Sequence, residues 1–442
     1  MSNMVMSKVA TFSMEKWNRE SAIKHTHQRE RMMAILKLHG VPIQTYAGVI
    51  PMQTYEVHLF QHQIAAIYRI ENRTVWILQA ARTVGKTQKE EVSQQLDETE
   101  KNRIVSLAIR TVYALGLDYG IVTVGVHSPI RMRVIDCHAQ LSVDVSLLER
   151  VQLFMKQREQ QILLDQVATP QVMLGADPEF ALRDQSGKMA IASEYLQKYG
   201  AVGYDGVRLK TELPSNQHPL VEVRPDPSTE PEIVMKNIYK ALHLAQRKIA
   251  DDSISWLAGG MPFDGYPIGG HVHVSGTALH FDLIRKLDTY LALPLCLLED
   301  RGCIKRRPRY GFLGDVREQP HGGFEYRTLP SWLVSPRMTK GVLTLTKVIV
   351  ESQYLLKRDV STDVAMQLAY YRGEKEKLTS LVKELYAELK VLPLYQTYRK
   401  YLTPFFHSIF TEGEWQSNHD IKLAWKLPPF QLNNHQEPCY NR

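Results

Sequence analysis

Acidic, imidazole and guanidinium side chains occur in pairs within four strand-like segments of the sequence: GADPEF, VEVRP, GGHVHV and FEYRTLP. The two members of each pair are separated by one residue. Since strand residues two apart lie on the same face of a sheet, both side chains of a pair should point the same way. The pairs are Asp177 with Glu179, Glu222 with Arg224, His271 with His273, and Glu325 with Arg327.

A fifth segment, RRPRYGFLGDVR at 306–317, is dense in arginine and glycine. Planar guanidinium groups bind phosphate oxygens well. Carboxylates with one or two histidines, and without thiolates, favour Mg²⁺ or Mn²⁺ over zinc. Two such ions about 3.5–4 Å apart, with arginines beside them, are typical of phosphoryl-transfer sites. The combination therefore predicts metal-dependent phosphoryl transfer.

Each pair also has a structural interpretation. An E-x-R pair on a strand is usually a solvated ion pair, an H-x-H pair is usually structural, and Asp177-Pro178 alone fits a turn. Five such segments within about 150 residues make a shared site the better interpretation.

The elements around these segments are segregated strands and helices, which favours α+β over a doubly wound sheet. Strands are predicted at 177–180, 220–224, 271–274 and 324–329, and helices at 231–250, 281–299 and within 340–390. The last stretch, 413–442, is polar and contains proline, and we expect it to be poorly ordered.

The N-terminal third predicts a separate, smaller α/β unit. A chain of 442 residues is long enough for two domains. We expect a first module at 1–168, a catalytic domain at 169–345 and a helical C-terminal extension at 346–442. The first module should hold short antiparallel strands at 56–84, a helix at 94–115, strands at 120–126 and 132–137, and a connector helix at 146–166.

The bulk composition indicates an ordinary globular protein. Its net charge of +7 is not gathered in one arm, so nucleic acid is not the favoured partner. No export signal or apolar span long enough for a membrane helix is visible, and we expect a cytoplasmic protein. Four cysteines without CxxC spacing should be reduced thiols: Cys137, Cys296, Cys303 and Cys439.

The order GADPEF, EVRP, GGHVHV, RRPRYGFLG and GFEYRTLPSW over 171–332 resembles the phage-type COOH-NH2 ligase branch of the amidoligases, relatives of glutamine synthetase and glutamate-cysteine ligase. The resemblance implies an antiparallel-sheet, glutamine synthetase-like catalytic domain. It also implies that ATP and Mg²⁺, or Mn²⁺, join a carboxylate to an amine through an acyl phosphate.

By the same resemblance, each motif residue has an expected role. The metal ligands would be Glu179, Glu222, His271 and Glu325, with Asp177 a further candidate because D-P-E stands where E-x-E is common. Nucleotide or acyl-phosphate contacts would come from His273, Arg309, Arg317 and Arg327. Arg224 would order Glu222 or bind a substrate carboxylate. Asp205, in GYDG, is the candidate general base.

The N-terminal module resembles the C-terminal part of an ATP-grasp domain. Thr123 stands where the first acid is usual, and Asp136 and His138 replace an E-x-N pair. The nucleotide-gripping lobe is too short, so we expect a degenerate module that is structural or presents substrate. AARTVGKT at 80–87 also fits a loose P-loop, but the following QKEE lacks the apolar face such a helix needs.

Two alternatives to a ligase stay open: a non-catalytic scaffold that binds phage, cell-wall or nucleic-acid partners, and a metal-dependent hydrolase. The substrates are also open. An amino acid, a cell-wall peptide, a polyamine or a protein tail would each supply a carboxylate or an amine. The oligomeric state is not predicted.

Overall fold

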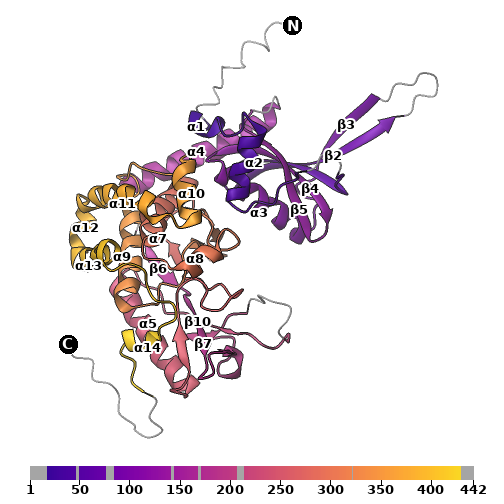
Figure 1. The fold of residues 1–442 in the computed structure, drawn as a ribbon. Helices are drawn as coiled ribbons and strands as arrows, with labels where there is room; N and C mark the ends of the chain where they lie inside the picture. Colours follow the sequence, from indigo (N-terminus) through magenta and orange to yellow (C-terminus); the bar gives the residue numbers. More distant parts are fainter. Residues whose placement is uncertain are drawn as a thin grey trace.

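The computed structural model describes residues 17–45, 49–75, 84–140, 144–167, 171–206, 214–320 and 322–429. Figure 1 shows a smaller N-terminal unit, built around one sheet, beside a larger part in which helices surround two further sheets. The observed mixture of helices and antiparallel strands confirms the predicted α+β composition. The glutamine synthetase-like arrangement and the division into three domains remain proposals.

The N-terminal unit is a five-stranded antiparallel sheet with the order β3-β2-β1-β4-β5. Short helices α1 (Glu20–Ile23) and α2 (Arg29–Leu38) precede it. Its strands are β1 (Gln53–Phe60), β2 (Gln63–Val75), β3 (Val84–Glu91), β4 (Tyr119–Ser128) and β5 (Arg131–His138). Residues 80–83 of the loose P-loop pattern lie outside the described residues. The residues after it form β3, where a P-loop requires a helix.

Two helices cover opposite faces of this sheet. Helix α3 (Glu98–Ala114) begins at Asp97, whose carboxylate accepts from the backbone of Thr99 and Glu100. Its buried side chains join those of β1 and β4 in the main core. Helix α4 (Val145–Val167), the predicted connector, buries Leu147 and Val151 against the other face. The sheet is therefore enclosed by apolar stripes at the spacing the sequence predicted.

The larger part contains two short-stranded antiparallel sheets. One has the order β13-β14-β12-β6, and the other has the order β11-β7-β10-β9 with β8 beside β7. The two residues Asp177 and Pro178 carry the chain from β6 in the first sheet to β7 in the second. The strands are β6 (Met173–Ala176), β7 (Glu179–Arg183), β8 (Met189–Ala190), β9 (Val202–Tyr204), β10 (Leu220–Val223), β11 (Ser255–Leu257), β12 (Val272–Ser275), β13 (Val316–Glu318) and β14 (Phe324–Tyr326).

Helices cover the outer side of these sheets (Figure 1). The central one, α9 (Pro336–Glu351), is largely buried and packs against α5 (Pro231–Ile249) and α13 (Arg399–Thr411). It also spans residue 345, the proposed domain limit. The remaining helices are η3 (Ala192–Glu194), α6 (Phe281–Leu287), η4 (Asp288–Ala292), α7 (Leu293–Cys296), α8 (Arg301–Arg306), α10 (Val364–Arg372), α11 (Lys375–Lys390), α12 (Pro393–Thr397) and α14 (Ile421–Ala424).

Four predicted segments differ from the structure. The strand predicted to end at 177–180 is broken, because Asp177 and Pro178 lie between β6 and β7, and the strand predicted at 324–329 ends at Tyr326. The helix predicted at 281–299 is interrupted by the π-turn η4 and has Pro294 at the start of α7. The segment from 413 is not a wholly polar tail, since residues up to 429 are described and α14 packs on β11. Buried Ile421 and Trp425 hold it, and the Trp425 indole donates to the Leu333 carbonyl at 2.7 Å.

Buried polar contacts join the N-terminal unit to the helices of the larger part. Arg285 of α6 is 1% exposed, and it donates to the carbonyls of Gly116 and Leu117 at 3.1 and 2.9 Å. The Tyr113 hydroxyl donates to Asp288 at 2.7 Å. These contacts give the two parts a shared and buried boundary.

Two further predictions concern thiols and membranes. Cys137, Cys296 and Cys303 are buried free thiols, and Cys439 lies outside the described residues. Within the described ranges, every helix is too short or too polar to cross a bilayer.

Candidate active site

One face of the β13-β14-β12-β6 sheet carries part of the charged residues of the sequence motifs. His273 of β12 is opposite Glu325 of β14, which is opposite Arg317 of β13. The intervening residues Val274 and Phe324 point into the core. Strand alternation therefore places acids, imidazoles and guanidinium groups together on the face away from the core, as predicted.

Four side chains in or directly beside the adjacent strands β6, β12 and β14 converge on this face. Nδ1 of His271 lies 3.1 Å from Asp177 Oδ1 and 3.2 Å from Glu325 Oε1. Nε2 of His273 lies 3.3 Å from Asp177 Oδ1. Asp177, His273 and Glu325 can each direct one ligand atom to positions within 4.8 Å of one another. We call Asp177, His271, His273 and Glu325 the acid-imidazole cluster.

Glu325 is the most enclosed member of the cluster, with 0% exposure. Arg317 Nε donates to its Oε2 at 2.9 Å, and Gln319 Nε2 donates to the same oxygen at 2.8 Å. Arg327 Nη1 donates to Oε1, also at 2.8 Å. These donors fix the orientation of the carboxylate and stabilise its charge inside the protein.

A second group of acids lies at the neighbouring sheet. Glu179 of β7 and Glu222 of β10 are directly opposite each other. Gly269 donates its backbone N–H to Glu179 Oε2 at 2.8 Å, and Arg224 forms an ion pair with Glu222. Because Asp177 acts electrostatically on both Glu179 and Glu222, the two acidic groups belong to one site.

Burial and mutual repulsion raise the pKa of two of these acids. Burial first, then Asp205 and Asp177, place the pKa of Glu179 well above its ordinary value. Burial and Asp177 raise the pKa of Glu222 to about 8, with Arg224 acting in the opposite direction. Closely spaced carboxylates repel one another when both are ionised, and a bound cation would stabilise their ionised forms.

The cluster itself shows the opposite tendency for Asp177. Burial alone would raise its pKa, but His271 and His273 hold the pKa well below its ordinary value. Burial alone would lower the pKa of His273, and Asp177 raises it. Asp177 therefore stays ionised beside two imidazoles, at the place where a metal ion would provide positive charge.

The donor set fits a divalent cation. Asp177 Oδ1 and His273 Nε2 are buried and close together, yet neither satisfies hydrogen-bond geometry with any described side chain. Carboxylate oxygens predominate around them. This chemistry suits Mg²⁺ or Mn²⁺, with imidazole as a tolerated additional ligand of the latter.

A cavity of about 570 Å³ opens beside the cluster. Asp177, Glu222, Arg224 and His273 line it, together with glycine and proline residues that leave room near the strands. Its size is within the range of small-molecule sites. The charged face is therefore accessible to a substrate.

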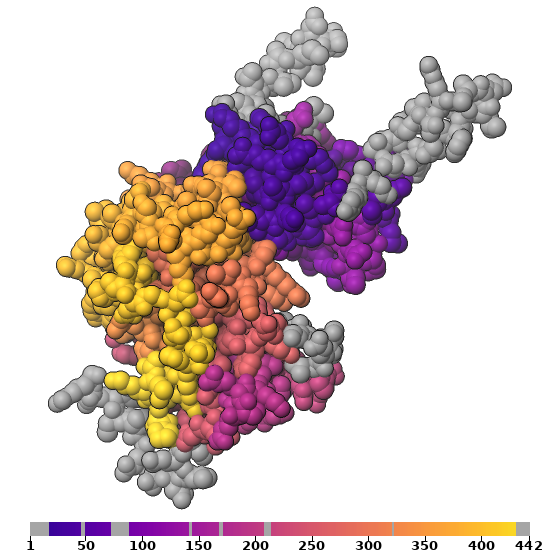
Figure 2. Space-filling view, in the orientation of Figure 1, coloured from indigo at the N-terminus to yellow at the C-terminus, as the bar shows by residue number. Residues whose placement is uncertain are grey.

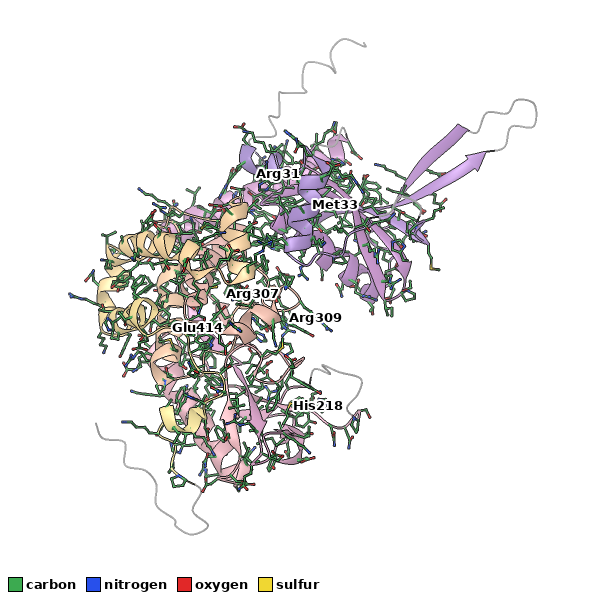
Figure 3. The ribbon with its side chains drawn as sticks, in the orientation of Figure 1. Arg31, Met33, His218, Arg307, Arg309 and Glu414 are labelled. Carbon is green, nitrogen blue, oxygen red and sulfur yellow. The ribbon has the colours of Figure 1, made fainter. Side chains whose placement is uncertain are left out.

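Not every predicted residue joins the cluster. Arg309 is exposed and lines a separate cavity of about 350 Å³ with Lys305 and Arg306. Figure 3 shows its side chain pointing into the open space between the two parts of the chain. Asp205 follows β9 and acts electrostatically on Glu179 and Glu222, which places it near the second acidic group.

Two residues of the site, Gln319 and Asp315, were missed in the sequence. Gln319 lies in the turn after β13 and contacts Glu325. Asp315 lies within the arginine-rich segment and pairs with Arg327 Nε at 3.8 Å. The first has no partner at a recognisable spacing. The second sits two residues before Arg317, where the alternation used for the other pairs could have indicated it.

The residues compared with ATP-grasp lie on the N-terminal sheet. Thr123 and Asp136 are directly opposite each other on β4 and β5. Glu56 is opposite Thr123 on the other side and pairs with His58 at 2.8 Å. These side chains share one face of the sheet, which carries its own set of acids and histidines.

A comparison with protein families matches residues 174–427 to "Phage phiEco32-like COOH.NH2 ligase-type 2". The matched segment includes every strand that carries the site. The chain belongs to this family of carboxylate-amine ligases. Membership supports an amide-forming ligase over the scaffold and hydrolase alternatives.

Comparison with curated proteins finds no match. Two solved structures show weak likenesses. The ATP-grasp ligase PsnB, complexed with a minimal precursor, is 11% identical with a TM-score of 0.25 and covers 32% of this chain. A bifunctional glutathione synthetase from Pasteurella multocida is 10% identical with a TM-score of 0.36 and covers 62%. The alignments span 64% and 53% of those chains, and at these scores neither bears on the fold.

Proposed function

We propose that this family member joins a carboxylate to an amine at the expense of ATP, with Mg²⁺ or Mn²⁺ at the acid-imidazole cluster. The convergence of Asp177, His273 and Glu325, in or beside three adjacent strands, is the observation that carries the proposal. Glu179 and Glu222 lie beside it and provide the acids for a second cation. A divalent cation bound there would offset phosphate charge and align the γ-phosphoryl group of ATP.

The first half-reaction requires a substrate carboxylate to attack the γ-phosphorus. An oxygen–phosphorus bond forms, the bond to ADP breaks, and an acyl phosphate results. Arg317 and Arg327 already flank Glu325, so their free N–H groups are positioned to stabilise charge on the transferred group. Arg309, on its separate surface, is a proposed contact for the nucleotide.

In the second half-reaction the amine nitrogen attacks the acyl carbon, and inorganic phosphate leaves. The nitrogen must lose a proton, so a base is needed within reach. Asp205 remains our candidate, because it lies near Glu179 and Glu222 at the edge of the site. Arg224 holds Glu222 and is the candidate for binding a substrate carboxylate.

Release of phosphate from ATP by the purified protein tests the proposal. The assay combines Mg²⁺ with a pool of carboxylates, a pool of amines, or both. Wild type should release phosphate efficiently only with both pools, and Glu325→Gln and Asp177→Asn should reduce the rate by at least about 100-fold. These two substitutions preserve side-chain volume, and unfolding curves establish that both variants are folded.

The alternatives give distinct results in the same assay. Release without an amine, at the full rate, indicates a hydrolase. Absence of release together with absence of ATP binding indicates a scaffold.

The N-terminal sheet, with Glu56 and Asp136 on one face, is proposed to be a degenerate ATP-grasp-like module that presents substrate.

A further inference from the structure

A second cavity lies where the N-terminal unit, helix α4 and the catalytic sheets meet. Its volume is about 380 Å³. Its walls come from the β1–β2 turn, from α4, from the loop after β12 and from the turn between β13 and β14. We call it the junction pocket. Figure 2 shows that the two parts of the chain leave a notch between them on the viewed face, so their boundary is not a closed surface throughout.

Polar atoms in the walls of the junction pocket are buried without a protein partner among the described residues. They are Thr277 Oγ1, His62 Nδ1, Arg158 Nε and His280 Nε2. Thr277 is only 9% exposed. Since buried polar atoms in native proteins are nearly always hydrogen-bonded, unpaired atoms gathered around one cavity indicate a polar ligand.

The junction pocket carries few charges. Arg158 is paired with Asp282, and Glu318 faces His62 at 3.4 Å. Burial first, and then Arg158 and His62, lower the pKa of His280 to about 3, so its ring is neutral. Burial also lowers the pKa of His62, so the ring that faces Glu318 is neutral and the pocket keeps one acid, Glu318, in surplus.

Carboxamides make up much of the remaining lining. The lining includes Gln61, Gln63, Gln157, Gln161 and Gln319. Of these, Gln61, Gln161 and Gln319 already donate an amide N–H to Asp118, Asp165 and Glu325. An amide offers both a donor and an acceptor, which matches the alternating N–H and C=O groups of a peptide backbone. A polyamine would require several unpaired acids, and a nucleic acid would require unpaired cations.

The junction pocket adjoins the catalytic cavity. Gln319 and Gly322 line both. Gln319 also donates to Glu325 of the acid-imidazole cluster. A ligand chain that fills the junction pocket therefore ends beside the cluster, and a free amino acid is too small to occupy both cavities.

We propose that the junction pocket binds the backbone of a peptide substrate whose end, a carboxylate or an amine, lies at the acid-imidazole cluster. This inference rests on the proposed ligase function and specifies its substrate class. The N-terminal unit supplies Gln63 and His62 to the pocket, so it contributes directly to substrate binding.

The test measures retention of small molecules by the full-length protein without ATP or metal. A pool of random pentapeptides is mixed with chito-oligosaccharides of similar length and with spermidine, and the retained compounds are identified by mass spectrometry. Gln157→Trp places a bulky ring at the pocket wall. Gln160→Trp, an exposed position on the same helix outside the lining, is the matched control. Thr277→Val removes one unpaired hydroxyl and serves as a second variant.

Wild type and Gln160→Trp should retain peptides, and Gln157→Trp should retain at least tenfold less. Thr277→Val should reduce retention about threefold, with an unfolding transition like that of wild type. Retention of sugars or spermidine in place of peptides, equal peptide retention by both tryptophan variants, or no retention would overturn the proposal. Because binding is measured without turnover, such a result leaves the ligase assay to decide the proposed function separately.

Discussion

The Gln319 side chain donates to Glu325 Oε2 over 2.8 Å, from a turn that lines both the junction pocket and the catalytic cavity. Glu325 in turn faces His271 at 3.2 Å. A neutral amide in a turn thereby orients an acid that we assign to the metal site. Contacts of this kind orient the residues that bind a metal ion, and their loss weakens metal binding.

Gln319→Ala should lower the ligase rate at limiting Mg²⁺ by about 10-fold or more, because Glu325 loses one of its donors. The measurement is a Mg²⁺ titration of amine-dependent phosphate release. Glu98→Gln is the control, since its exposed side chain pairs with Lys101 on α3, away from both cavities. An unchanged Mg²⁺ requirement in Gln319→Ala would show that Arg317 and Arg327 position Glu325 without it.

Asp177→Asn should weaken Mn²⁺ binding by at least about tenfold, because a neutral amide replaces the negatively charged carboxylate that lies beside His271 and His273. Free Mn²⁺ can be followed by electron paramagnetic resonance. Asp264→Asn, at an exposed acid paired with Lys305, should bind like wild type. Equal affinity in all three proteins would place the ion elsewhere.

Glu299→Ala should reduce the free energy of unfolding by about 3–5 kcal/mol, because it leaves the Arg307 charge buried without its acid. The two side chains are 2% and 1% exposed, and the Arg307 guanidinium lies 3.7 Å from the centre of the Tyr370 ring. Urea unfolding measures the change. Asp264→Ala, which breaks an exposed pair, should cost no more than about 1 kcal/mol. Similar losses in both variants would argue against a buried ion pair.

Acid should destabilise the protein through His39, which joins α2 to α10. Its ring contacts Gln367 at 3.2 Å and the Tyr371 hydroxyl at 3.0 Å. Burial lowers the pKa of His39 to about 4, whereas the unfolded chain should titrate near its ordinary value of about 6.5. The unfolded state therefore binds more protons in this window. Stability is fully present above about pH 6.5 and decreases as the pH falls toward 4.

The full effect of His39 corresponds to about 3 kcal/mol. His39→Gln should show a smaller loss than wild type between pH 7 and pH 5 in denaturant unfolding. His27→Gln, at an exposed histidine, should keep the wild-type dependence. A His39→Gln protein as acid-sensitive as wild type would assign the effect to other groups.

The sequence predicted the charged face because strand alternation is local. A spacing of two residues alone predicts that the members of a pair share one face of a strand, as for His271 with His273 and for Glu325 with Arg327. The pairing of β12 with both β14 and β6 brings them together, and this long-range register is not encoded in spacing. Gln319 escaped notice because one amide in a turn has no periodic partner.

Two other differences have equally simple causes. Trp425 and Ile421 dock a mostly polar segment onto the core, and two apolar residues are too few to produce a pattern. The helical periodicity of 281–299 gave no warning of a π-turn, because the buried residues continue through it. Helix boundaries and terminal segments thus depend on tertiary packing that the local sequence does not specify.

Arg285 has a practical implication for any attempt to shorten this protein. Its guanidinium donates hydrogen bonds to the carbonyls of Gly116 and Leu117 and to the Asp118 carboxylate, all in the N-terminal third. A truncated chain starting at residue 169 would expose this cation and leave its neighbours without their acceptors. Buried hydrogen bonds therefore cross the boundary at residue 169. Activity should be measured first with the full-length chain.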